Sequence, residues 1–180
     1  MILGAILGGG RSSRFGSDKA EALWRGIRLI DHVHARLATV AAEIVVCGWQ
    51  GAGFRAVADR PAAGLGPLGG LAGALHHAAS AGFDRVLTIP CDTPLLSDAL
   101  LTALARAPGD AFLAEMPVIG SWRTAGGPAL DAYLAIADSD RSVRGWAAAL
   151  GADPIDLPAP PNINRRADLA ALEARQPSPF

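Results

Sequence analysis

Short runs of apolar residues alternate along the chain with longer segments in which apolar residues recur at helical spacing. The runs that predict buried strands span residues 2–7, 43–47, 54–58 and 85–89. The segments that predict helices span residues 29–40, 67–81 and 98–106. Strands that alternate with helices are typical of a mostly parallel sheet with helices on both faces, so we expect a Rossmann-like α/β fold.

The second half of the chain continues this order with shorter elements. The strands expected there are a pair at residues 110–114 and 118–122 and an edge strand at 151–157. The helices expected there are 126–137, 141–150, capped by Asp140 or Ser139, and 167–175. We find no internal repeat, and 180 residues suit one domain. We therefore expect residues 1–180 to form a single domain.

Charge and composition narrow the class of protein. The 16 basic and 17 acidic residues give a formal net charge of −1, which argues against the broad basic face that binds nucleic acids or anionic membranes. Residues 1–10 are apolar, but they have no basic segment before them and are too short to span a bilayer. We expect a cytoplasmic protein in which Cys47 and Cys91 are buried and reduced.

The segment that follows the first expected strand carries the clearest chemical signal. Residues 7–19 read LGGGRSSRFGSDK, in which Gly8, Gly9 and Gly10 allow backbone N–H groups to approach phosphate oxygens closely. Arginines and Lys19, the only lysine in the chain, add positive charge within the same segment. Open α/β sheets bind ligands at the carboxyl ends of their strands, so this segment predicts a nucleotide site.

Two common nucleotide loops do not match this spacing. A P-loop needs glycine directly before its lysine and Ser or Thr after it, whereas Asp18 and Ala20 flank Lys19. A Rossmann dinucleotide loop needs a third glycine where Ser13 stands and an acidic residue about 20 positions later, at the end of the second strand. Neither residue is present in this chain. The segment therefore belongs to a different class of nucleotide site.

Residues 7–19 resemble the signature loop of the molybdenum cofactor guanylyltransferases, which reads approximately L-A-G-G-x-S-x-R-M-G-x-D-K. Later stretches of the chain match the same family in the same order: Asp59 with residues 66–70 (GPLGG), residues 90–94 (PCDTP), and residues 162–164 (NIN) with Asp168 and Leu169. The resemblance thus spans most of the chain. It implies the fold shared with nucleotide-diphospho-sugar transferases.

The resemblance also implies roles for individual residues. The nucleotide-binding residues that it implies are Leu7, Gly8, Gly9, Gly10, Lys19, Asp59 and Asp92. It further implies that Lys19 contacts the phosphates, that Asp92 binds Mg²⁺, and that Asn162 and Asn164 lie on the acceptor side of the cleft.

These implied roles suit the transfer of GMP from GTP to the phosphate of molybdopterin, with release of pyrophosphate. We expect Arg14, Lys19 and Asp92 to be the catalytic residues, because basic groups and Mg²⁺ on a carboxylate stabilise the charge of the leaving pyrophosphate. A phosphate acceptor is already ionised at neutral pH, so the reaction requires no strong general base. Transient contact with other proteins of cofactor synthesis, or with the apo-enzymes that receive the cofactor, is a further expectation.

Two departures from the family pattern keep alternatives open. Where the family has an asparagine after its second strand, this chain reads Cys47-Gly48-Trp49-Gln50, so that nucleotide contact is either lost or supplied by Gln50. Met116 stands where the family often has a histidine. The alternatives are a related nucleotidyltransferase that uses CTP or another phosphorylated acceptor, and a nucleotide-binding module that assists cofactor delivery without catalysis.

Overall fold

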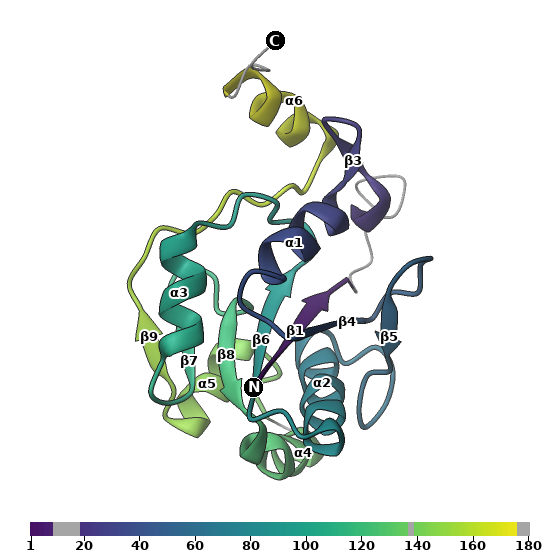
Figure 1. The fold of residues 1–180 in the computed structure, drawn as a ribbon. Helices are drawn as coiled ribbons and strands as arrows, with labels where there is room; N and C mark the ends of the chain where they lie inside the picture. The colour runs from purple at the N-terminus through teal and green to yellow at the C-terminus, as the bar shows by residue number, and fades with distance from the viewer. Residues whose placement is uncertain (9–18, 137–138, 176–180) are drawn as a thin grey trace.

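A computed structural model describes residues 1–8, 19–136 and 139–175 of the chain (Figure 1). In these ranges no helix has both the length and the apolar character that crossing a bilayer requires. Gly9, Gly10 and Arg14, which the sequence singles out, lie outside the described residues.

A mixed sheet forms the centre of the molecule. In the described part of the chain its strands are β1 (Ile2–Leu7), β4 (Glu43–Cys47), β5 (Arg55–Val57), β6 (Arg85–Pro90), β7 (Ala111–Leu113), β8 (Gly120–Arg123) and β9 (Asp153–Ile155). Their spatial order is β5-β4-β1-β6-β8-β7-β9. All pairs are parallel except those of β8, which runs antiparallel to both β6 and β7. The expected mostly parallel sheet is therefore confirmed.

Helices cover both faces of this sheet, as expected. The helices are α1 (Leu29–Leu37), α2 (Pro67–Ala81), α3 (Asp98–Arg106), α4 (Gly127–Ala135), α5 (Val143–Leu150) and α6 (Arg166–Arg175). One apolar core joins the sheet to α2, α4 and α5, and a second core joins its other face to α1 and α3 (Figure 1). The inner strands β1, β4 and β6 can thus be apolar on both faces, which is why their runs in the sequence do not alternate with polar residues.

Small residues let α2 approach the strands that carry the site. A Cβ at Gly73 would lie 2.2 Å from the carbonyl oxygen of Ala58, and one at Gly70 would lie 3.1 Å from the Cβ of Cys47. The helix begins with Pro67 at its first position and ends at Ala81, and Gly82 caps it with a φ of 78°, a conformation that glycine adopts without strain. Glycine in α2 is therefore a packing requirement at this sheet surface.

The structure corrects some expected details. The cap of α5 is Ser142, whose Oγ accepts a hydrogen bond from the backbone N–H of Gly145, and not Asp140 or Ser139. Asp140 instead accepts from the N–H of Ser142 and so holds the turn before the cap. Helix α1 ends at Leu37, three residues before its expected end.

A small hairpin between the first strand and α1 was not predicted. It follows a 3₁₀ turn (Lys19–Glu21) and pairs β2 (Leu23–Trp24) with β3 (Ile27–Arg28). Strands of two residues have no recognisable period, so no pattern along the chain predicts them. Trp24 packs here with Leu29, Ile163 and Leu172 in a third apolar cluster, and α6 thereby lies beside the hairpin (Figure 1).

Candidate functional site

Three parallel strands end together at the centre of the sheet. Leu7, the last residue of β1, pairs with Cys47 at the end of β4 and with Pro90 at the end of β6. Beyond the strands, the N–H of Gly8 donates to the Cys47 carbonyl at 2.9 Å and the N–H of Cys91 donates to the Leu7 carbonyl at 3.1 Å. The expected nucleotide loop and the Asp92 turn therefore start side by side, where open α/β sheets bind ligands.

Lys19 is the centre of a polar cluster at this edge of the sheet. Its Nζ donates to Oδ2 of Asp92 at 3.2 Å and to Oδ1 of Asn164 at 2.6 Å. The Lys19 and Asp92 side chains are 22% and 16% exposed, so a solvent-borne ligand can reach both. The structure thus brings together three of the residues that the sequence singled out.

The backbone of the C-terminal segment fixes where Asn164 lies. The N–H of Ile163 donates to the carbonyl of Asp92 at 2.8 Å, and the Ile163 side chain is buried in the third apolar cluster. Asn162 and Asn164 are both exposed, but Asn162 makes no hydrogen bond to Lys19 or Asp92 within the described residues. Only one of the two expected acceptor-side asparagines therefore joins this cluster.

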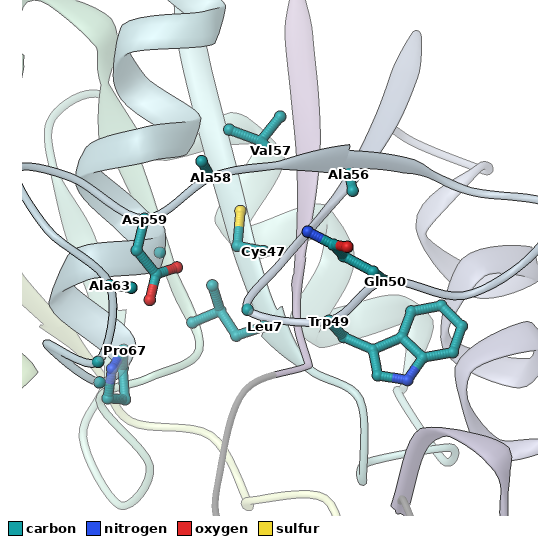
Figure 2. A pocket seen from close by; sticks show the side chains of 14 residues that line it. Leu7, Cys47, Trp49, Gln50, Ala56, Val57, Ala58, Asp59, Ala63 and Pro67 are labelled. Carbon is teal, nitrogen blue, oxygen red and sulfur yellow. The ribbon is translucent and has the colours of Figure 1, made fainter.

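A pocket of about 910 Å³ opens beside the same strand ends. Its lining residues are Leu7, Cys47, Gly48, Trp49, Gln50, Ala56, Val57, Ala58, Asp59, Ala63, Gly64, Gly66, Pro67 and Gly70. Figure 2 shows Asp59 and Gln50 on opposite sides of Leu7 and Cys47. The walls are otherwise mostly apolar, as is usual for a small-molecule site with a few orienting polar groups.

Asp59 is the acidic residue of this pocket. Its Oδ1 is buried, and no hydrogen-bond partner for it occurs in the part of the chain that the structure describes. A buried acceptor without a partner costs about 1–3 kcal/mol, so a ligand that donates to this oxygen gains affinity. Asp59 is therefore suited to bind a donor group of a ligand.

Cys47 forms part of the pocket floor as a thiol. Burial, with a smaller contribution from the negative charge of Asp59, raises the pKa of Cys47 to about 12. Cys91 is buried as well, as expected. The neutral Cys47 thiol contributes apolar surface and leaves Asp59 as the charged group of the pocket.

Trp49 supports the pocket wall next to Gln50. A Cβ at Gly8 would lie 2.6 Å from the Trp49 Cβ, and one at Gly51 would fall 1.8 Å from the indole ring. Phe54 packs edge-on against Trp49 with ring centroids 5.8 Å apart. The Trp49 side chain thus packs against Gly8, Gly51 and Phe54, while the neighbouring Gln50 is exposed and lines the pocket.

Asp92 has the chemistry of a Mg²⁺ ligand. Mg²⁺ commonly binds one or two carboxylates together with water and substrate phosphates, and it does not need a cage of protein ligands. No group of three His, Cys, Asp or Glu side chains that could form such a cage occurs among the described residues. A partly exposed carboxylate beside Lys19 fits a metal that arrives with a nucleotide.

Several residues that line the pocket have no functional signal in the sequence. Ala56, Val57, Ala58 and Ala63 are small apolar residues that carry no chemical signature. Their closeness in sequence to Asp59 was the one signal that could have indicated them. Their contribution is shape, which depends on how β5 and the following turn pack against α2.

Comparison with known proteins gives consistent matches. Residues 4–153 match the model of the MobA-like NTP transferase domain. A molybdenum cofactor guanylyltransferase of Rhodobacter capsulatus is 36% identical over an alignment 186 positions long, gaps included. The alignment covers 97% of this chain and 96% of that protein. A probable molybdenum cofactor guanylyltransferase of Deinococcus radiodurans is 37% identical, with 97% of this chain and 95% of that protein covered.

Solved structures agree on the fold. Molybdopterin-guanine dinucleotide biosynthesis protein A of Archaeoglobus fulgidus superposes with a TM-score of 0.73 at 18% identity, covering 97% of this chain and 98% of its own. A CMP:2-keto-3-deoxy-manno-octonic acid synthetase complexed with CTP gives a TM-score of 0.67 at 17% identity, with 97% of each chain covered. The nucleotidyltransferase fold implied by the signature loop is therefore confirmed.

Proposed function

The chain belongs to the MobA-like NTP transferase family, and we propose that it transfers GMP from GTP to the phosphate of molybdopterin and releases pyrophosphate. The observation that carries this proposal is the convergence of Lys19, Asp92 and Asn164 beside the Asp59 pocket. The relatives named above are guanylyltransferases over nearly the whole chain, so the alternatives of a CTP enzyme or a non-catalytic module are not favoured.

Guanine suits the pocket because the hydrogen-bonding groups on its Watson–Crick edge match the carboxylate of Asp59. Guanine presents two adjacent donors, the N1–H and the N2 amino group, and a carboxylate is an acceptor with two oxygens. Asp59 offers such a carboxylate, one oxygen of which lacks a partner among the described residues. Adenine and cytosine each place a ring-nitrogen acceptor where guanine has N1–H, so the same carboxylate disfavours them. The Gln50 amide on the other side of the pocket can donate to guanine O6.

The triphosphate would then extend from the pocket toward Lys19. A lysine ammonium is a compact charge on a flexible stem, which suits contact with phosphate oxygens that move during the reaction. Asp92 would hold Mg²⁺, which when bound supplies charge neutralisation for the triphosphate and the leaving pyrophosphate. Arg14 is proposed as a second basic group, although it lies outside the described residues.

The proposed reaction is an in-line displacement at the α-phosphorus. An oxygen of the molybdopterin phosphate forms a bond to the α-phosphorus, and the bond from that phosphorus to the α,β-bridging oxygen breaks. Pyrophosphate leaves with the electron pair of the broken bond, and Lys19 stabilises the charge that develops on it. Asn164, and Asn162 two positions before it, would face the acceptor. Because the acceptor oxygen is already ionised, none of these side chains has to remove a proton.

We also propose that the reaction takes place in the cytoplasm, since the free, buried thiol of Cys47 fits a reducing compartment. Transient contact with proteins that supply or receive the cofactor is part of the same proposal.

The proposal is tested by pyrophosphate release from GTP, CTP and ATP, each with molybdopterin and Mg²⁺. We expect rapid release with GTP and at least about tenfold slower release with the other two, because a mismatched edge leaves buried polar groups unpaired. Faster release with CTP than with GTP would contradict the assignment of guanine. No release with any of the three nucleotides would contradict the proposed activity.

A further inference from the structure

Asp168 is connected to Lys19 by a short chain of hydrogen bonds. Its Oδ2 accepts from the backbone N–H groups of Asn164 and Arg165, each at 2.8 Å. The Asn164 side chain accepts in turn from Lys19 Nζ at 2.6 Å, and Lys19 also contacts Asp92. A carboxylate in the first turn of α6 thus reaches the phosphate-binding lysine through one intervening residue.

Asn164 is held from two directions. On its N-terminal side, Ile163 is anchored through its backbone bond to the Asp92 carbonyl and through its burial. On its C-terminal side, Asp168 holds the N–H of Asn164 itself. With the backbone fixed on both sides, the carboxamide of Asn164 is presented to Lys19 in one place.

The bond to Asn164 goes beyond ordinary helix capping. Because α6 begins at Arg166, Asp168 is its third residue, the position from which an acidic side chain commonly reaches back to the N–H of the residue before the helix. The bond to Arg165 is of that kind. The bond to Asn164 lies one residue further from the helix and orients a residue that contacts Lys19.

The neutral amide of Asn164 is also the appropriate second partner for Lys19. Asp92 already supplies one negative charge, and a second carboxylate would further compensate the ammonium that must attract phosphate. A carboxamide oxygen orients the ammonium without adding charge. A lysine side chain is flexible, so such orientation has to come from its partners.

We propose that Asp168 is a positioning residue, whose carboxylate fixes the backbone at Asn164 so that the Asn164 side chain holds the Lys19 ammonium beside Asp92. The consequence for catalysis rests on the proposed function, in which Lys19 contacts the nucleotide phosphates. The positioning of Lys19 by Asp168 does not depend on the proposed function, because it concerns contacts within the chain.

The sequence provides a direct readout of this positioning. Lys19 is the only lysine in the chain, so protein labelled with ¹⁵N-lysine carries a single side-chain ammonium whose NMR signal reports on Lys19 alone. We expect this signal to shift or broaden in Asp168→Ala, in the same direction as in Asn164→Ala. Asp168→Asn keeps an acceptor oxygen and is expected to leave the signal close to that of the wild type.

Ser142→Ala is the matched control, because it removes the cap of α5 without contact to Lys19. It should leave the ammonium signal unchanged. If Asp168→Ala fails to fold, Asp168→Ser is the second variant. The serine hydroxyl is one bond closer to the backbone than the aspartate oxygen, so it should not reach the N–H of Asn164, and we expect the Lys19 signal to shift as well. An unchanged signal in a folded Asp168→Ala or Asp168→Ser protein would overturn the proposal.

Pyrophosphate release tests the consequence for catalysis. Misplacing a catalytic group by about 1 Å can cost on the order of 10²-fold, so we expect Asp168→Ala to lower kcat about tenfold, with rescue by Asp168→Asn. In the Asn164→Ala background the Asp168→Ala change should have no further effect on kcat. A full, independent effect in that background would mean that Asp168 acts only as a helix cap. If wild-type protein releases no pyrophosphate, the proposed function fails, while the ammonium signal still decides the positioning.

Discussion

The ammonium of Lys19 lies 3.2 Å from the carboxylate of Asp92, although 73 positions separate the two residues in the chain. The contact joins the end of the glycine loop that follows β1 to the turn that follows β6, and those two strands are neighbours in the sheet. The basic group proposed to contact the phosphates and the carboxylate proposed to bind Mg²⁺ thus lie together. Each of the two can be tested separately.

Replacing Lys19 by arginine tests whether its shape matters as well as its charge. A planar guanidinium imposes a fork geometry and cannot place one donor between Asp92 and Asn164 as an ammonium does. We expect Lys19→Arg to lower kcat for pyrophosphate release about tenfold, equivalent to about 1.4 kcal/mol of transition-state stabilisation. Arg55→Lys makes the reverse exchange at an exposed position and should leave kcat unchanged. Equal turnover of Lys19→Arg and wild type would show that charge alone suffices.

Replacing Asp92 by alanine tests the proposed metal ligand. The change removes the carboxylate at which Mg²⁺ would bind, so we expect a loss of at least about 10²-fold in kcat, since metal stabilisation of transition-state charge is worth several kcal/mol. The dependence of the rate on Mg²⁺ concentration should move to higher concentrations. Asp153→Ala, on the exposed edge strand β9, is the control. An unaltered Mg²⁺ titration in Asp92→Ala would exclude Asp92 as the ligand.

Replacing Asp59 by asparagine tests the proposed recognition of guanine. An amide keeps the size of the side chain but substitutes donors for one acceptor oxygen, which no longer matches the two adjacent donors of guanine. We expect kcat/KM for GTP to fall about tenfold or more, because a well-placed bidentate pair is worth about 1–3 kcal/mol of discrimination. The ratio of GTP to ATP turnover should fall with it. Asp153→Asn should preserve this ratio, and an equal preference for GTP in Asp59→Asn would place base recognition elsewhere.

Cys47 should make the folded state sensitive to high pH. Its pKa is raised from 9.0 to about 12 in the folded protein, so the unfolded chain loses the thiol proton first as pH rises. The resulting stability is complete below pH 9 and is lost progressively up to pH 12.

Between pH 9 and pH 10 the loss due to this group should be about 1 kcal/mol in the free energy of unfolding. Urea denaturation at the two pH values measures it, with Cys47→Ala as the comparison protein. The variant should lose correspondingly less stability over this interval, because every other titrating group is retained. The same loss in both proteins would mean that Cys47 does not titrate as the structure indicates.

Local patterns along the chain were sufficient to predict most of the fold. The apolar runs of β1, β4 and β6 and the helical periods of α1, α2 and α3 all appear where the sequence predicted them. Elements too short to show a period, such as β2 and β3, were missed. The expected cap of α5, Asp140 or Ser139, is wrong, and Ser142 is the cap. All three side chains can cap a helix, and the backbone conformation determines which of them reaches the free N–H groups.

The candidate site was predicted less completely than the fold. Lys19, Asp92 and Asn164 were singled out by motif, and the structure brings them into one cluster. Asp168 was noted as part of a motif without a role, since a side chain that acts through a neighbour's backbone has no signature of its own. The roles assigned to Gly9, Gly10 and Arg14 stay predictions.

The alternation of strands and helices, the glycine-rich segment after the first strand and the single lysine at its end can be read from the sequence alone. These features depend on residues close together in the chain, where period and spacing can be read directly. Only the folded chain shows that Asp59, with one buried oxygen, lines the pocket, and that Asn164, 145 positions away, accepts a hydrogen bond from Lys19. Such contacts depend on the order of strands in the sheet and on the packing of α6, which no local pattern specifies.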